Sequence, residues 1–151
     1  MSEDQPTFQI EKIYVKDLSL EIPNAPQVFL QAEQPQLEVQ IDNASAQFAD
    51  GMYEVTLSVT VTARVGERTI FLAEAVQAGI FAVRGVPQAD LEPLLAIGCP
   101  TILYPYARET VSDLVTRGGF PQLLLAPLNF DALYRQHLEQ GQQEQTGDSK
   151  H

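Results

Sequence analysis

Cys99, His137 and His151 are the only cysteine and histidines of this sequence, and nucleophilic chemistry would depend on them. A nucleophilic cysteine or serine usually needs a base within hydrogen-bond reach. His137 beside Cys99 would meet that need. The pattern is more typical of a half-exposed helix histidine and of a small buried thiol between Gly98 and Pro100. The sequence therefore predicts no catalytic residue and no enzyme.

Metal and nucleotide sites need ligands or motifs that this sequence does not supply. Zinc takes three or four Cys, His or carboxylate ligands, so one cysteine and two histidines would need several carboxylates beside them. None of the glycines belongs to a Gly-Lys-Ser/Thr motif that would cradle a phosphate. We expect no metal and no cofactor, and any energy-dependent step would belong to another protein.

Asp17 and Glu21 form a carboxylate pair with a defined spacing. Alternate residues of a strand face the same side, so the two carboxylates share a face, with no apolar pocket to raise a pKa. They are either solvated side chains or a docking surface for a basic partner, and the residues alone leave both open. The net charge of −11 disfavours nucleic acid and anionic lipid, and residues 1–54 carry ten acids against two lysines.

Strand patterns occupy the first half of the chain. Phe8 to Ile22 alternates in more than one phase, which predicts a strand with bulges or a bend. Residues 37–41 and 55–63 alternate cleanly, and Gly66 supplies a turn into a further strand over residues 70–83. This last strand is apolar on both faces. It needs cover on both, which predicts self-association.

Helical patterns follow the strands. Residues 90–97 predict a short helix that Gly98 and Pro100 terminate. Residues 103–115 repeat apolar side chains at spacings of three and four, which predicts a longer helix with Pro105 in its first turn.

Asn129 is predicted to cap a third helix that runs to Leu138. From Gln140 onward the chain is polar and rich in Gly and Gln, so we predict one domain over residues 1–139 and a disordered tail over residues 140–151. The longest apolar runs are far shorter than the roughly 18 to 20 residues of a membrane span. An acidic N-terminus unlike a signal peptide predicts a soluble protein without membrane insertion that is not exported by its own signal, and a single cysteine fits a reducing compartment.

The segment Phe120–Leu128 is a linker of unusual composition, because Gln122 is its only polar side chain. Pro121 and Pro127 exclude an ordinary helix interior, so the linker should run extended over a surface. Any single apolar residue in it is more often core. As a set, a proline-broken segment with few backbone hydrogen bonds favours exposure, and so the linker must either cover or bind something.

Two blocks of sequence are specific enough to indicate a family: Pro-Tyr-Ala-Arg-Glu at 105–109 and Phe-Pro-Gln…Ala-Pro…Asn-Phe-Asp-Ala-Leu over 120–133. With residues 13–19, 23–26 and 53–63, they make the chain resemble the bacterial protein-export chaperone family SecB from about Phe8 to Leu138. The resemblance implies an α+β fold, a four-stranded antiparallel sheet with two main helices on one face, assembled as a homotetramer that is a dimer of dimers. It also implies a cytoplasmic, ATP-independent holdase that binds unfolded preproteins and delivers them to the SecA ATPase.

The same resemblance implies two surfaces. The crossing loop (residues 23–35) and the linker would flank a groove for the unfolded client. The implied groove residues are Phe29, Leu37, Val39, Ile41, Phe120, Leu123, Leu125, Phe130 and Tyr134. The implied docking surface for SecA consists of Asp17, Glu21, Leu72 and Glu74. Family members often carry a tryptophan in the crossing loop, where this chain has Glu33.

Two other functions stay open at this point. The first keeps the fold and changes the client, as in SecB-like chaperones that guard antitoxins. The second is a small-ligand-binding or hydrolytic α+β enzyme that uses the apolar groove as a pocket, which the poor inventory of histidine and cysteine disfavours.

Overall fold

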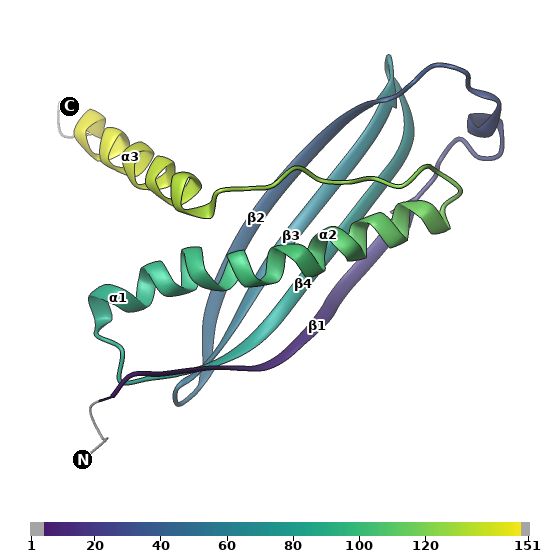
Figure 1. Cartoon of the computed structure of the whole chain (residues 1–151). Helices are drawn as coiled ribbons and strands as arrows, with labels where there is room; N and C mark the ends of the chain where they lie inside the picture. Colours follow the sequence, from purple (N-terminus) through teal and green to yellow (C-terminus); the bar gives the residue numbers. More distant parts are fainter. Residues whose placement is uncertain (1–4, 149–151) are drawn as a thin grey trace.

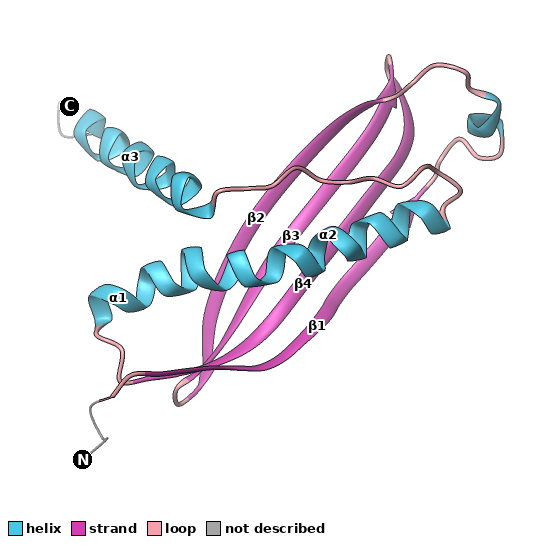
Figure 2. Cartoon of the chain, in the orientation of Figure 1, coloured by secondary structure: helices cyan, strands magenta, loops and turns pink. Residues whose placement is uncertain are grey.

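A computed structural model describes residues 5–148, with the side chains of residues 5–141. Four strands form one antiparallel sheet in the order β1-β4-β3-β2, the long helix that follows them lies across one face of it, and the C-terminal helix extends away from the sheet beyond β2 (Figures 1 and 2). The strands are β1 (Thr7–Glu21), β2 (Gln36–Ala49), β3 (Met52–Val65) and β4 (Arg68–Arg84). The helices are α1 (Gln88–Pro93), the π-helical turn η3 (Leu94–Gly98), α2 (Cys99–Arg117) and α3 (Phe130–Asp148), with a 3-10 turn η2 (Gln27–Leu30). The predicted α+β fold of the chain, built on a four-stranded antiparallel sheet, is confirmed.

The core lies between α2 and the sheet, and we call the face of the sheet that α2 covers the inner face. Alternate side chains of β3 point to it, from Val55 to Ala63, and each is at most 1% exposed. Leu103, Ala107 and Val111 pack from α2. Since a half-covered strand buries every second residue, the Thr and Ser side chains of β3 line the opposite, outer face.

β1 changes phase twice along its length. Its register against β4 shifts between Ile10 and Lys12, and again between Val15 and Asp17. Each shift inserts one extra residue and moves the following side chains to the other face. The bulged strand predicted from the mixed alternation is confirmed.

β4 is an interior strand, with β1 on one side and β3 on the other. Its inner-face Phe71 and Ala73 are buried, and its outer-face Leu72, Val76 and Ile80 are half-buried. Side chains of the two neighbouring strands flank the outer three, so part of the cover that the sequence demands comes from within the chain. The apolar outer face of β4 is therefore not sufficient evidence for self-association.

The prediction that Gly98 and Pro100 end a short helix is wrong, because α1, η3 and α2 continue one another from Gln88 to Arg117. The Cys99 N–H donates to the carbonyl of Leu94, five residues earlier, which widens the turn into a π-helix. Pro100, which has no N–H to donate, follows directly where the π-helical turn passes into α2.

Pro105 lies inside α2 and not in its first turn, which corrects the second helix prediction. Its side chain is exposed, away from the sheet. On that side, water can replace the hydrogen bond that a proline removes. The helix ends at Gly118 and Gly119 as predicted.

Two elements run further than their patterns predict. β2 extends to Ala49, although residues 42–49 are exposed on both faces and the apolar residues Ala44, Ala46 and Phe48 are out of phase with Leu37, Val39 and Ile41. α3 begins after Asn129, whose side chain accepts from the Ala132 N–H at 3.0 Å, as predicted. It continues to Asp148, and the predicted tail is thus helical over residues 140–148, since Gln and Glu are good helix formers. The last three residues of that tail lie outside the described part of the chain.

None of the helices in the described part of the chain combines the length and apolarity of a membrane span.

Candidate functional site

An aromatic cavity of about 410 Å³ opens between the crossing loop and the linker. Three rings lead from the core to its mouth. Phe71 of β4 is buried, Phe120 of the linker lies 4.8 Å from it between ring centroids, and Phe29 of η2 stacks on Phe120 at 5.4 Å. Phe29 is 51% exposed. The outer end of this ring series is therefore available to an apolar side chain from another molecule.

Gly119 sets the distance between the two walls of the aromatic cavity. Its φ is +89°, a conformation that glycine adopts without strain. A Cβ at this position would lie 3.2 Å from the Phe29 ring, a closer approach than most side chains tolerate. The chain therefore makes a tight turn from the end of α2 into the linker, close to η2.

The three leucines of the linker have different environments. Leu123 is half-buried and lines the aromatic cavity, Leu124 is 71% exposed, and Leu125 is 6% exposed in the core. The Tyr104 hydroxyl donates to the carbonyl of Ala126 and fastens the linker to α2. The linker therefore both covers the core and offers apolar surface. Leu125 is one of the residues that cover the core.

A second, wider cavity of about 830 Å³ lies between the inner face of β2, the η3 turn and α3. Phe130 anchors the start of α3 in the core, with its ring 5.7 Å from that of Tyr104 in an edge-to-face arrangement. Ile41 and Tyr134 line the cavity. Burial, with Glu92 beside it, raises the pKa of the Tyr134 hydroxyl.

The structure divides the predicted client groove between these two cavities. The predicted groove residues that line the aromatic cavity are Phe29, Leu37, Phe120 and Leu123. Those that line the wider cavity are Ile41, Phe130 and Tyr134. Val39 is exposed on β2 between the residues that line each cavity, and Leu125 lies beneath. Alternation along β2 aims Leu37, Val39 and Ile41 at one side, so the strand forms a floor common to both.

The surroundings of Cys99 do not support a role as a nucleophile. The thiol is fully buried, and burial raises its pKa to about 12, so it stays protonated at neutral pH. His137 lines the wider cavity from α3. Among the residues that the structure describes, no three His, Cys, Asp or Glu side chains form a group that could hold a metal ion.

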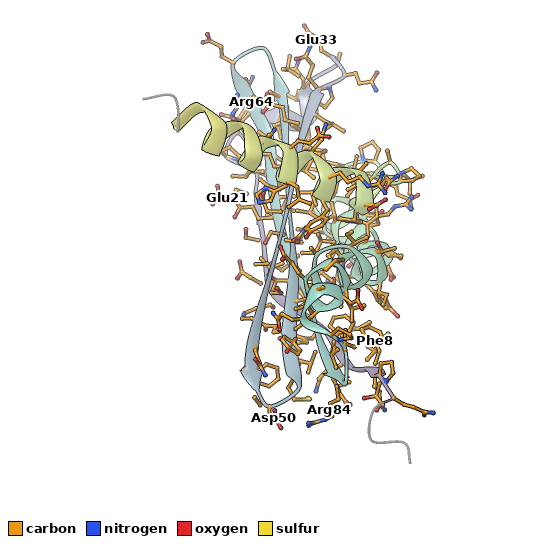
Figure 3. The ribbon with its side chains drawn as sticks, turned by 90° about the vertical axis from the view of Figure 1, so that its left-hand side faces the viewer. Phe8, Glu21, Glu33, Asp50, Arg64 and Arg84 are labelled. Carbon is orange, nitrogen blue, oxygen red and sulfur yellow. The ribbon has the colours of Figure 1, made fainter. Side chains whose placement is uncertain are left out.

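The four predicted docking residues lie on the outer face of β1 and β4. Glu21 pairs with Leu72, and Glu74 pairs with Ser19 between Glu21 and Asp17. Figure 3, which shows the sheet close to edge on, places Glu21 on the side away from α2. The structure therefore brings these residues together, well apart from both cavities.

Two further acids complete this outer face, and sequence reasoning missed them. Following the pairing across all four strands, Asp17 shares a row with Asp42, and Glu21 shares a row with Glu38. Strands lie about 4.8 Å apart, so the ends of each row are about 14 Å apart. The signal was present, since Glu38 and Asp42 alternate with the apolar side of β2 in the sequence.

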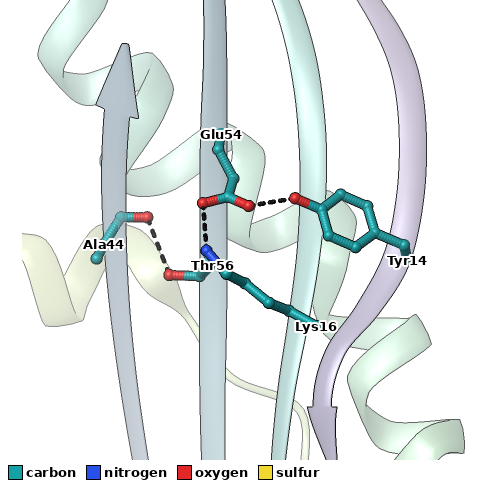
Figure 4. Close-up of polar contacts among 5 residues, drawn as sticks. All are labelled: Tyr14, Lys16, Ala44, Glu54 and Thr56. Carbon is teal, nitrogen blue, oxygen red and sulfur yellow. Dashed lines mark hydrogen bonds and ion pairs between the residues drawn. The ribbon is translucent and has the colours of Figure 1, made fainter. Parts of the chain in front are cut away.

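A polar cluster borders this acidic surface (Figure 4). Glu54 of β3 accepts a hydrogen bond from the Tyr14 hydroxyl, and the Lys16 ammonium lies 2.8 Å from its other oxygen. The hydrogen bond from Lys16, and next that from Tyr14, hold the pKa of Glu54 below its usual value. Burial and then Glu54 raise the pKa of Tyr14 to about 12. Lys16 is thus engaged with Glu54.

Replacing Glu54 by glutamine is expected to change the pH dependence of stability. A carboxylate whose pKa is lowered by folding stabilises the fold above its unfolded pKa of 4.5, and this contribution is lost as pH falls through the folded value. The stability difference between the native protein and Glu54→Gln should therefore narrow below pH 4.5. Urea midpoints measured across acidic pH test this, and a difference that stays constant would contradict it.

A comparison with known protein families shows to which family this chain belongs. The model described as "Preprotein translocase subunit SecB" matches residues 1–141. The chain belongs to the SecB family. A curated relative from Chromobacterium violaceum, named protein-export protein SecB, is 58% identical over 145 residues, covering 96% of this chain and 95% of the relative. One of the same name from Neisseria meningitidis serogroup B is 53% identical over 141 residues, covering 92% and 96%.

The SecB fold is also seen in a solved structure. The SecB-like chaperone of Mycobacterium tuberculosis, in complex with an antitoxin peptide, is 23% identical, with a TM-score of 0.67 over 80% of this chain and 90% of that one. At this identity the likeness concerns the fold alone.

One edge of the SecB sheet carries apolar side chains that sequence reasoning did not select. β1 is an edge strand, and Phe8, Ile10, Val15 and Leu18 on its inner side are each at least 40% exposed. An unpaired strand edge beside apolar side chains is typical of a surface that another chain covers.

Proposed function

We propose that this chain is an ATP-independent holdase that binds unfolded segments of preproteins along the inner face of β2. The observation that carries the proposal is the aromatic cavity, whose three rings run from the core to a half-exposed Phe29. A preorganised apolar cavity open at its mouth suits an extended chain with apolar side chains. Family membership supports an export role in the cytoplasm.

Weak individual sites suit this function. Burying one apolar client side chain contributes about 1.5 to 3 kcal/mol. Ordering each client residue costs about 1 to 2 kcal/mol. One cavity therefore holds a short segment only weakly, and several cavities acting on one long chain raise the effective concentration. The client is held firmly, and each contact still dissociates readily.

We infer that the holdase is a homotetramer, a dimer of dimers. The exposed apolar side of β1 supports association between copies, and so does membership of the SecB family. A tetramer supplies the repeated cavities that the affinity requires.

Charged substitutions on this edge are expected to dissociate the tetramer. Val15→Asp with Leu18→Asp would place two carboxylates in an apolar interface, where burying an unpaired charge is costly. Light scattering after size exclusion should show a particle of fewer chains. Phe48→Asp is the control, since Phe48 is 57% exposed on β2, the opposite edge strand. A tetramer that survives the double substitution would contradict the assignment of this edge.

We propose further that the outer face around Asp17, Glu21, Leu72 and Glu74 docks a basic surface of SecA. Charge complementarity supports this, because the carboxylates of Asp17, Glu21 and Glu74 are interspersed there with the apolar side chains of Leu72 and Val76. The cavities and this face lie on opposite sides of the sheet, so client and partner can bind at the same time, which delivery requires.

Light scattering with and without a reduced, unfolded preprotein tests the proposed function. The expected result is a tetramer that captures the unfolded chain without ATP and ignores the folded form. Equal binding of folded protein, or none of either, would refute it.

A further inference from the structure

Gln77 is a buried polar side chain on the inner face of β4. It is 3% exposed, and its nearest neighbours on the same face of the strand are the small residues Ala75 and Gly79. A buried amide is costly unless its polar atoms are bonded. Both are: the Nε2 group donates to the Tyr14 carbonyl at 3.2 Å, and the Oε1 atom accepts from the Thr110 hydroxyl at 2.8 Å. The amide therefore links β4 to β1 and to α2.

The bond to Tyr14 lies at the second bulge of β1. Val15 pairs with Gln77 and Asp17 pairs with Val76, so Lys16 is the extra residue. If the register of Val15 and Gln77 continued without this shift, Asp17 would oppose Ala75, which is 1% exposed in the core. The bulge is what carries Asp17 and Glu21 to the outer face, because a shift of one residue exchanges the two faces of a strand.

The same bulge is also held from the outer face. The Tyr14 hydroxyl and the Lys16 ammonium both bond Glu54 on β3, across the β4 strand between them (Figure 4). The side chain opposite Tyr14 on β4 is Ala78, and its small size leaves room for that crossing. Tyr14 is thus fixed twice, by Gln77 through its carbonyl and by Glu54 through its hydroxyl.

We propose that Gln77 is a positioning residue for partner docking: by holding the Tyr14 carbonyl at the second bulge, it fixes the orientation in which β1 presents Asp17 and Glu21 on the outer face. This inference rests on the proposed docking of SecA to that face. It assigns a role in docking to a residue on the opposite side of the sheet, which would never touch the partner.

Gln77→Met tests the proposal, since methionine nearly preserves the volume and removes both hydrogen bonds. Two readouts are expected to change. Amide hydrogen exchange of residues 14–18 should accelerate at least tenfold, and the Kd for SecA should rise at least fivefold, while capture of unfolded client stays within twofold. If this variant does not fold, Gln77→Asn keeps an amide and shortens its reach to Tyr14.

Leu57→Val is the matched control, because Leu57 pairs with Gln77 from β3 and is equally buried in the same layer. It should lower stability and leave both readouts within twofold of the native protein. Unchanged exchange over residues 14–18 in Gln77→Met would overturn the proposal, as would an equal loss of SecA affinity in Leu57→Val. If the native protein binds no SecA, the docking proposal and the role of Gln77 in it both fail. The exchange readout would then still decide whether Gln77 holds the bulge.

Discussion

Replacing Phe29 by alanine together with Leu123 by serine lowers the affinity for an unfolded client at least tenfold. The two side chains form opposite walls of the aromatic cavity, on the crossing loop and on the linker. Each contributes on the order of 1 kcal/mol or more to a bound apolar side chain. Tenfold in Kd corresponds to about 1.4 kcal/mol, so the pair exceeds that threshold even with partial exposure. Titration of a labelled, reduced preprotein measures the change.

Two neighbours that do not line the cavity give matched controls. Leu30 is 87% exposed in the same crossing loop, and Leu124 is 71% exposed in the same linker. Leu30→Ser and Leu124→Ser should change client affinity by less than twofold. Leu125→Ser differs again, because loss of a buried leucine costs about 2 to 5 kcal/mol of stability, and client binding would then fall only through unfolding. Equal effects from all these substitutions would mean that general apolarity, and not the cavity, binds the client.

Asp17→Lys with Glu21→Lys is expected to weaken SecA binding at least thirtyfold. The two carboxylates flank Glu74 on the outer face, and their reversal replaces attraction for a basic partner by repulsion. Client capture should be unchanged, because both cavities lie on the other side of the sheet. Calorimetry at two salt concentrations gives the affinity for SecA and shows whether it depends on direct contact between charges, since such contacts weaken as salt screens them.

The control for this variant changes the net charge equally at other positions. Glu67→Lys with Glu139→Lys alters the β3–β4 turn and α3, and it should leave SecA affinity within threefold. A second variant, Glu38→Lys with Asp42→Lys, measures whether docking extends across the sheet to β2. Salt-insensitive binding that survives reversal of Asp17 and Glu21 would contradict docking on this face.

Strands could be read from the sequence where one face is covered, as in β3, whereas β2 beyond Ile41 is exposed on both faces and could not be read in this way. The two phase changes of β1 appear as breaks in alternation, and the structure has a register shift at each. The joined helix could not be read in the same way. Gly98 and Pro100 are common at helix ends, and only a π-helical turn at Leu94–Gly98 lets the chain pass them as helix. That turn depends on tertiary packing, which local propensity does not encode.

The candidate site was predictable as a set and not residue by residue. The composition of the linker Phe120–Leu128 marks it as unusual, but which of its leucines are buried depends on tertiary contacts, among them the hydrogen bond from the Tyr104 hydroxyl to the Ala126 carbonyl. Glu38 and Asp42 were missed for a related reason. Their place beside Asp17 and Glu21 depends on the strand order β1-β4-β3-β2, which alternation within single strands does not give.

The most direct test of the holdase claim is a methyl NMR titration of the protein, labelled at Ile, Leu and Val, with a reduced, unfolded preprotein and no nucleotide. The predicted result is shift changes at Leu37, Ile70 and Leu123 around the aromatic cavity, none at Leu72 and Val76 on the outer face, and none anywhere with the folded preprotein. Unperturbed cavity methyls, or the same shifts with the folded form, would contradict it.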